Sequence, residues 1–520
     1  MRSERVLAVV AMAFACLAGL YFRVWHVAGQ PFWLDEAYSA YAADHGFAFL
    51  WNVVPRYETH PPFYYALLRI WSLAIGDSLS ARRALGLACG AATIPIAGYA
   101  AAMLARLIGW SPSRSRRLVG FTVILMSLHP FAILMSRQVR PYPVMILVYA
   151  GAILLLLRIA IESRRCLPVG GSGRGYRLIL LAVAEAAISW LHALGPLFGG
   201  SIAIALALLV IRRDLAWRDW AALCASQILA ALIYLPALFI TLGQASEWIG
   251  STWLNFTSHG LRQDLGLLYF TWGMTPQIVA AVAALIGTVA IAKSVPVGMR
   301  SAAALLILAI LPTLASIVLS LTIAPVFLVR TLSPVMVPAM LLIAAGLSAL
   351  DIRRWLVVPV AVYLIQAESA VDLRLVRQGA QQNWYGAVDW LTPRMHPGDI
   401  IWAYPNETAL PLAYALRDRK RVLPVRPIPA PVPAFGVGGF YVAGSRGVVS
   451  LYPSEIAALV RSRAGSSPPT IWLVRLSAWE YDRDDRLLSA LRANRCVAGR
   501  MHSDQIDIVG LSRTTGPCRP

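Results

Sequence analysis

Repeated apolar runs, each long enough to cross a bilayer, most constrain what this chain can fold into. Runs of roughly 17–25 mostly apolar residues recur up to about residue 370, and a helix of that length spans a hydrocarbon layer of about 30 Å. In lipid, each backbone N–H and C=O group must be bonded within its own element, which favours helices. The composition agrees, because 58% of the residues are hydrophobic and only 14% are charged. A water-soluble fold would have too little polar surface.

The runs predict about eleven transmembrane helices. The expected spans are 6–22, 84–107, 118–136, 143–160, 178–193, 196–211, 220–241, 276–293, 301–321, 332–350 and 355–367. The first run could instead be a cleaved signal peptide, but further spans follow it, so we interpret it as a transmembrane helix.

Basic residues gather in alternate loops, on the same side of the membrane as the N-terminus. The positive-inside rule then predicts a cytoplasmic N-terminus, and an odd number of spans places the C-terminus on the outer side of the membrane. The expected membrane is a bacterial plasma membrane. The net charge of +20 therefore indicates topology and does not favour a nucleic-acid partner, because the charges lie in short loops and not on one helix face.

The sequence predicts two domains. Residues 1–369 form a polytopic α-helical membrane domain with a first external loop at 23–83, where 47–54 and 62–71 are amphipathic. Residues 370–520 form a small extracytoplasmic α/β domain, because strand signals at 399–404 and 470–474 alternate with helix signals at 453–463 and 485–495. The proline-rich segment 424–433 predicts an irregular surface stretch.

The six cysteines include no CxxC pair. Cys496 and Cys518 lie in the polar C-terminal region and could pair if that region faces an oxidising compartment.

An adjacent acid pair, Asp35 and Glu36, follows the first span. Two neighbouring carboxylates at a membrane surface are costly, because like charges repel each other and burial penalises the charged form. One interpretation is a solvated pair in a loop, with Asp35 near the N-cap of a surface helix. The other is a functional pair.

Further along the same loop, Glu58 and His60 precede Pro61 and Pro62. His60 could bind a phosphate, and Glu58 with His60 could bind a divalent cation, although a lone histidine is more often structural. The two prolines are expected to start the next helix.

The stretches Trp33 to Tyr38 and His60 to Tyr65 resemble the first external loop of the GT-C glycosyltransferases. The similarity is strongest to the branch that contains the protein O-mannosyltransferases and the lipid A aminoarabinose transferase. Further matches at the external side are Arg137 to Tyr142, Trp190 to His192, and Arg330 with Pro334 and Pro338.

This resemblance implies an inverting transfer of a sugar from an undecaprenyl or decaprenyl phosphate carrier to an extracytoplasmic acceptor. By the resemblance, Asp35 is the general base, and Glu36 pairs with an arginine such as Arg140. Arg140, Arg330, Tyr142 and His60 are the expected donor-phosphate residues, since guanidinium groups suit phosphate oxygens. Arg137 and Arg262 are weaker candidates.

Some members of this family bind a metal ion near the carrier phosphate, and the candidate ligands here are Glu58, His60 and His192. The acceptor could be a lipid, a polysaccharide or a protein. The C-terminal domain shows no carbohydrate-binding pattern and the chain has no obvious peptide-recognition module, which counts against a protein.

Two hypotheses compete with a transferase. A transporter or flippase of lipid-linked sugars should carry ionisable groups near the bilayer midplane, where only Glu185 stands out. A non-catalytic assembly protein would leave the acid pair and the His60 loop unexplained.

Overall fold

The computed structural model describes residues 2–164, 175–212, 215–251, 256–269, 274–350, 382–435 and 451–513. The chain divides into two compact units. The helical unit comprises Met1–Trp25, Arg83–Phe239 and Trp253–Leu373, and the mixed unit comprises His26–Arg82, Ile240–Thr252 and Arg374–Pro520.

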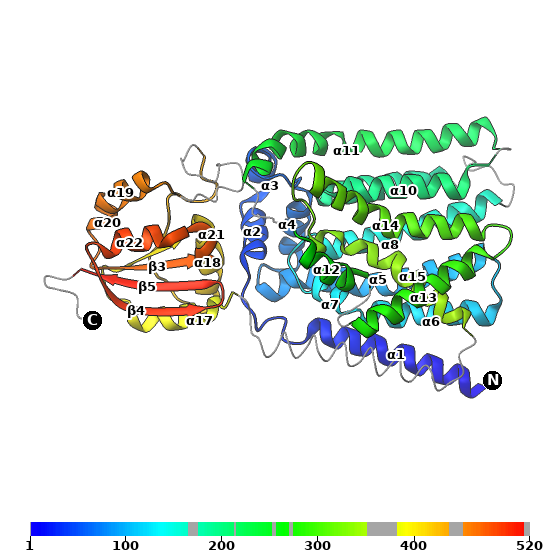
Figure 1. The fold of residues 1–520 in the computed structure, drawn as a ribbon, viewed down its shortest axis with the longest axis horizontal. Helices are drawn as coiled ribbons and strands as arrows, with labels where there is room; N and C mark the ends of the chain where they lie inside the picture. The colour runs from blue at the N-terminus through cyan, green and yellow to red at the C-terminus, as the bar shows by residue number, and fades with distance from the viewer. Residues whose placement is uncertain are drawn as a thin grey trace. The chain divides into compact units, whose positions relative to one another are not determined.

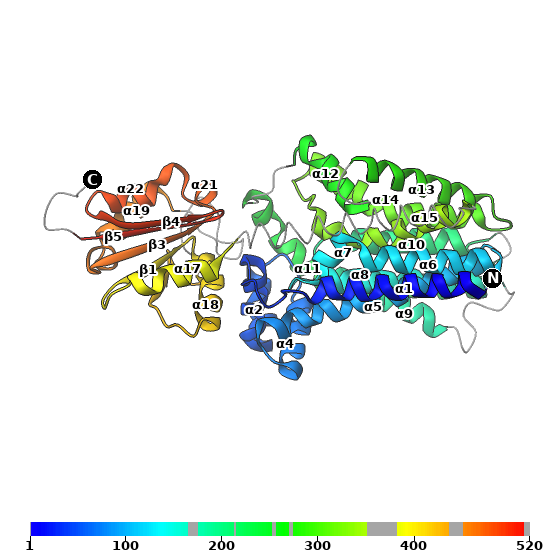
Figure 2. The same ribbon diagram turned by 90° about the horizontal axis from the view of Figure 1, so that it is seen from below.

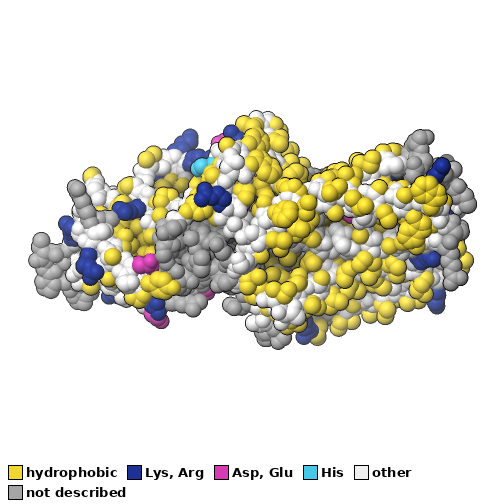
Figure 3. Space-filling model, turned by 90° about the horizontal axis from the view of Figure 1, so that it is seen from above, with side chains coloured by type: hydrophobic (Ala, Val, Ile, Leu, Met, Phe, Trp, Pro, Cys, Tyr) yellow, Lys and Arg dark blue, Asp and Glu magenta, His cyan; other side chains and the backbone are white. Residues whose placement is uncertain are grey.

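The helical unit is built from long apolar helices, many of which run side by side in Figure 1. They are α1 (Arg2–Val24), α5 (Leu79–Leu107), α6 (Pro112–Leu128), α7 (Pro130–Ser136), α8 (Tyr142–Arg164), α9 (Gly175–Leu191), α10 (Gly195–Val210), α11 (Trp217–Ser251), α12 (Ser258–Tyr269), α13 (Met274–Ala292), α14 (Gly298–Thr322), the 3-10 helix η2 (Val329–Val335) and α15 (Met336–Ala349). Apolar side chains cover the face of these helices that Figure 3 shows, as expected of a surface in contact with lipid tails.

Each predicted span in the described part of the chain coincides with a helix, whereas the span at 355–367 lies outside the described residues. Among the described helices, six are long and apolar enough to cross a membrane, or seven if a bent pair counts as one span. The multi-pass membrane fold is therefore confirmed, while the predicted number of about eleven spans stays a prediction. The bent pair is α6 and α7, which meet at 55°, so the segment predicted as a span at 118–136 is not one straight helix.

Two glycines allow α13 and α15 to pack closely. A Cβ atom on Gly287 would lie 1.9 Å from the Leu342 carbonyl oxygen, and one on Gly346 would lie 1.8 Å from that of Ala283. Neither position can therefore carry a side chain without separating the helices. Small residues at helix contacts are the usual way for membrane helices to approach, because burial from water contributes little there.

The mixed unit combines the first loop with an α/β domain. The loop forms α2 (Leu34–Asp44), α3 (Gly46–Asn52), the 3-10 turn η1 (Val54–Arg56) and α4 (Phe63–Ile75), so both amphipathic stretches are mostly helical. The helical elements of the α/β part are α17 (Trp384–Leu391), η4 (Thr392–Arg394), η5 (Asn406–Thr408), α18 (Ala409–Asp418), α19 (Pro453–Arg461), α20 (Arg463–Ser466), α21 (Ala478–Tyr481), η6 (Arg483–Asp485) and α22 (Arg486–Arg492).

A five-stranded sheet lies at the centre of this domain. Its order is β2-β1-β3-β5-β4, with β1 (Ile400–Tyr404) parallel to β2 (Val425–Pro427) and β3 (Thr470–Leu476). The strand β5 (Ile506–Ser512) runs antiparallel to β3 and β4 (Cys496–Ser503). The predicted α/β domain is thus confirmed, but the proline-rich segment is not wholly irregular. It contributes β2 at the sheet edge, where proline is tolerated because the outer side of an edge strand needs no ladder bond.

Helices cover both faces of the sheet. Trp402 and Ile471 pack with residues of α19 and α22 on one face, and Ile401 and Trp472 pack with residues of α17 and α18 on the other, as Figure 2 shows. Successive strand residues point to opposite faces, so a strand buried on both sides must be apolar throughout, as the sequence Ile-Ile-Trp-Ala-Tyr of β1 is.

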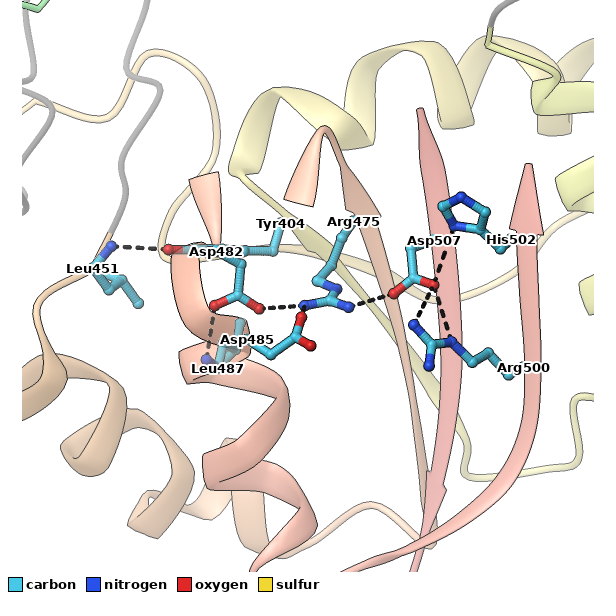
Figure 4. Close-up of polar contacts among 9 residues, drawn as sticks. All are labelled: Tyr404, Leu451, Arg475, Asp482, Asp485, Leu487, Arg500, His502 and Asp507. Carbon is cyan, nitrogen blue, oxygen red and sulfur yellow. Dashed lines mark hydrogen bonds and ion pairs between the residues drawn. The ribbon is translucent and has the colours of Figure 1, made fainter. Parts of the chain in front are cut away.

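A buried ion cluster ties α22 to the sheet (Figure 4). The guanidinium of Arg475, only 1% exposed, lies 2.6 Å from a carboxylate oxygen of Asp482 and 2.6 Å from one of Asp485, and it also pairs with Asp507. Asp482 in addition accepts the backbone N–H of Leu487 in α22 at 2.8 Å. The ion pairs of Arg475 therefore link β3 with β5 and with the segment just before α22.

We expect Arg475→Met to destabilise the protein by about 3–5 kcal/mol, because it leaves buried carboxylates without their cation. Thermal unfolding of the purified full-length protein measures the effect. Arg500→Met is the matched control, since Arg500 also contacts Asp507 but its side chain is 59% exposed. Equal unfolding midpoints for the two variants would contradict the structural role of the cluster.

Candidate functional site

The acid pair lies in the first turn of α2. The helix begins at Leu34, so Asp35 and Glu36 place negative charge where the helix dipole is positive. Asp35 is 7% exposed and Glu36 is 1% exposed. The expected solvation of the pair is therefore wrong, because both residues are buried, although Asp35 does lie at the start of a helix, as that interpretation expected. Buried acids in a first turn need partners or a chemical role.

The second half of the loop packs beside α2. The Tyr38 hydroxyl donates to that of Tyr57 at 2.9 Å. Burial raises the pKa of the Tyr38 phenol well above its usual value, and the nearby Tyr57 and Glu58 raise it further. Tyr38 thus stays a neutral donor. The structure brings the Glu58 segment close to the helix that carries the acid pair.

Glu58 fixes the turn that leads into α4. One of its carboxylate oxygens accepts the backbone N–H of His60 at 3.2 Å and the Thr59 hydroxyl at 3.4 Å. After Pro61, residue Pro62 occupies the N-cap of α4, which begins at Phe63. The prolines start the helix as predicted. The carboxylate of Glu58 is thereby engaged in holding His60 in place.

In the helical unit, three of the four residues predicted to bind the donor phosphate lie together around Tyr142, whereas the fourth, His60, belongs to the mixed unit. The Arg330 Nε atom donates to the Tyr142 hydroxyl at 3.0 Å. The Arg140 guanidinium lies 5.7 Å from the centre of the Tyr142 ring, and the ring centres of His192 and Tyr142 are 6.2 Å apart. Two cations and an imidazole, from three distant segments, thus surround one phenol. Such a group can bind an anion with several oxygens.

Breaks in the helices place these residues. Arg140 lies between α7 and α8, His192 between α9 and α10, and Arg330 in the 3-10 helix η2. The His192 Nδ1 atom accepts the N–H of Leu194 at 3.1 Å, so Nε2 carries the proton when the ring is neutral. These interruptions bring the three side chains to Tyr142 from separate parts of the sequence.

Arg23, which the sequence analysis did not single out, bonds to the chain at the bend between α6 and α7. Its guanidinium is 2% exposed and donates to the carbonyl oxygens of Ser127 at 2.6 Å and Met126 at 3.2 Å, at the end of α6. Helix ends leave carbonyls without intrahelical partners, and Pro130 has no N–H to offer. Two features of the sequence could have indicated this contact. One is an arginine at the end of the first apolar run, and the other is the pair His129 and Pro130, which interrupts a later run.

The remaining candidates are placed elsewhere. The Arg137 guanidinium donates to the Phe22 carbonyl oxygen at 2.6 Å, and Arg262 is exposed on α12. Within the described residues, no group of three or more His, Cys, Asp or Glu side chains could hold a metal ion. Glu58, His60 and His192 therefore gain no support as a ligand set. Cys496 is disulfide-bonded, while Cys518 lies outside the described residues, so their pairing stays a prediction.

No family model matches the sequence, and no curated protein matches it. Solved structures do match. The apo structure of ArnT, the lipid A aminoarabinose transferase of Cupriavidus metallidurans, is 15% identical, with a TM-score of 0.58 and 98% of each chain covered. The structure of that protein bound to undecaprenyl phosphate matches at 15% identity and a TM-score of 0.57, covering 100% of this chain and 99% of the other.

The Archaeoglobus fulgidus oligosaccharyltransferase, in complex with Zn and sulfate, is 12% identical with a TM-score of 0.51, and the match covers 97% of this chain and 73% of that one. Both proteins are GT-C superfamily members. The predicted GT-C fold is therefore confirmed.

We expect Arg23→Met to destabilise the detergent-solubilised protein by about 1.5–3 kcal/mol, because charge-assisted hydrogen bonds to the end of α6 are lost. The thermal unfolding midpoint measures the effect. Arg300→Met serves as control, since Arg300 also donates to a carbonyl, that of Ile211 at 2.9 Å, but is exposed. A wild-type midpoint for Arg23→Met would show that the bend does not depend on this arginine.

Proposed function

We propose that this chain is a membrane glycosyltransferase. It transfers a sugar from a polyprenyl phosphate carrier to an acceptor at the outer face of a bacterial plasma membrane. The observation that carries the proposal is the convergence of Arg140, Arg330 and His192 on Tyr142, in a chain with the GT-C fold. A protein with the same fold has been solved with undecaprenyl phosphate bound, which supports a polyprenyl-linked donor.

The proposed reaction needs a base and an anion site. Asp35 takes the proton from an acceptor hydroxyl as the hydroxyl oxygen attacks the anomeric carbon, and the bond from that carbon to the phosphate oxygen breaks. The configuration inverts, because attack and departure occur on opposite faces. The leaving group is already a stabilised phosphate, so it needs charge neutralisation by Arg140 and Arg330 more than a strong general acid. Glu36, beside the base, helps to hold the loop.

The proposed location follows the basic loops, with the N-terminus in the cytoplasm and the catalytic loop and α/β domain outside. The disulfide at Cys496 supports an oxidising environment for that domain. The acceptor is a lipid, a polysaccharide or a protein.

Asp35→Asn should lower kcat about 10²–10⁴-fold, because an amide cannot accept the acceptor's proton. The assay follows release of undecaprenyl phosphate from synthetic undecaprenyl phosphate-linked mannose, glucose and aminoarabinose, in membranes that supply the acceptor. Asp77→Asn is the control, since Asp77 lies in the same loop with its side chain 72% exposed. Unchanged transfer by Asp35→Asn would remove Asp35 as the base.

The alternative is a transporter. It would be favoured if the wild type transferred sugar from none of the donors but moved these lipids across the membrane of reconstituted vesicles. The buried Glu185 does not demand that function, because its carboxylate accepts the side-chain amide of Gln227 at 3.2 Å, a bond between α9 and α11.

Arg330→Gln should weaken binding of undecaprenyl phosphate about tenfold or more, the effect of losing a hydrogen bond to a charged group. Native mass spectrometry of the purified protein with added undecaprenyl phosphate measures the change. Arg158→Gln controls for lost charge, because the exposed Arg158 bonds to Tyr99 at 2.7 Å, away from the Tyr142 cluster. Equal affinities for the wild type and Arg330→Gln would rule out Arg330 as a phosphate ligand.

A further inference from the structure

The helix that carries the acid pair starts without a cap of its own. Its N-cap residue, Trp33, makes no side-chain capping bond, although the first amides of any helix lack intrahelical acceptors. The acceptor for the first of them comes from the far end of the chain. The Leu34 N–H donates to the Gln382 side-chain oxygen at 2.9 Å, across 348 positions. Gln382 therefore fulfils the role that Ser, Asp or Asn usually has at an N-cap.

Gln382 is itself held in place. It is 8% exposed, its amide nitrogen donates to the Gln505 side-chain oxygen at 2.8 Å, and its oxygen also accepts the indole N–H of Trp384 at 3.2 Å. Trp384 is fully buried in the core beneath α17. An amide with partners on both ends and packed on a buried ring cannot reorient freely, so it defines a fixed point for Leu34.

Apolar contacts reinforce that point. The Leu34 side chain packs against the same core cluster that contains Trp384 and Leu412. Phe32, which is 1% exposed, meets the Tyr414 ring edge-on with ring centres 5.4 Å apart. The residues on either side of Trp33 are thus anchored in the α/β domain, and Asp35 is the next residue after the anchor.

The other end of α2 is anchored to the same domain. The Tyr41 hydroxyl donates to the Val432 carbonyl oxygen at 2.6 Å. Asp44, the last residue of the helix, accepts the Tyr414 hydroxyl at 2.6 Å and pairs with the buried guanidinium of Arg82. With both ends bonded, α2 can neither slide along its axis nor turn without breaking several polar contacts.

We propose that the α/β domain positions the catalytic helix, and that Gln382 is the positioning residue that sets where Asp35 stands. This inference rests on the proposed function of Asp35. A general base acts only within hydrogen-bond reach of the proton it takes, and a displacement of about 1 Å can cost on the order of 10²-fold in rate. The Gln382 oxygen bonds the amide one residue before Asp35, so its loss releases the helix start at that residue.

Three variants of the full-length protein test this role. Gln382→Leu removes the acceptor, and Gln382→Asn keeps the amide but shortens the side chain by one methylene. Each should lower kcat about 10-fold to 100-fold with the donor KM unchanged, since Gln382 is not one of the proposed donor-phosphate residues. Gln382→Glu keeps an oxygen for Leu34, and Gln505 can turn its amide to donate, so kcat should return to within about twofold of wild type.

Hydrogen exchange gives a readout that does not depend on activity. The peptide covering α2 should exchange faster in Gln382→Leu and Gln382→Asn than in the wild type, while peptides of α8 and α14 stay unchanged. Tyr385→Phe is the matched control in the same domain, because it removes only an exposed hydrogen bond, from Tyr385 to Asp418 at 2.9 Å. It should leave both kcat and exchange at wild-type values.

Wild-type kcat and exchange in both Gln382→Leu and Gln382→Asn would overturn the positioning role, and so would an equal loss in Tyr385→Phe or no recovery in Gln382→Glu. If Gln382→Leu does not fold, the Gln382→Asn and Gln382→Glu pair decides the question. An active Asp35→Asn would instead refute the proposed base and leave the exchange result standing, so the two failures are distinguishable.

Discussion

The need to bond every backbone polar group away from water governs the rest of this structure. Long helices meet it within themselves, and where the chain leaves the helix, side chains replace the missing partners. Arg23 bonds the carbonyls at the end of α6, and His192 accepts an amide before α10. Two further interruptions, between α7 and α8 and at η2, carry Arg140 and Arg330. Positions where the regular ladder stops are therefore the positions from which polar groups can reach a ligand.

In the mixed unit, the main constraint is the burial of two adjacent acids, Asp35 and Glu36. Both are buried in the first turn of α2, where the helix dipole favours negative charge. The elements that contact α2 come from both ends of the chain. The α/β domain contributes Gln382, Val432 and Tyr414 to contacts with α2, so its sheet serves as the support of the loop as well as a domain with its own core.

Periodicity and composition predicted the apolar helices and the strands β1 and β3, because these follow from local patterns of hydrophobicity, whereas the GT-C fold was predicted from the resemblance of short motifs. The resemblance named Arg140, Tyr142, His192 and Arg330 as candidates, since each segment has its own short motif, but it did not predict that they meet around Tyr142. Burial of the acid pair could not be predicted, because it depends on packing between distant segments. Neither could Gln382, whose partner is 348 residues away, nor the bend after α6, since an apolar run that contains proline can continue as a kinked helix.

The long separation between Leu34 and Gln382 has a consequence for biosynthesis. The first loop leaves the ribosome early, but the acceptor for its first amide is made only after all of the described membrane helices. Until then α2 lacks the bond that fixes its start, and the acid pair has no settled position. The support of α2 is therefore complete only after the last part of the described chain has been synthesised.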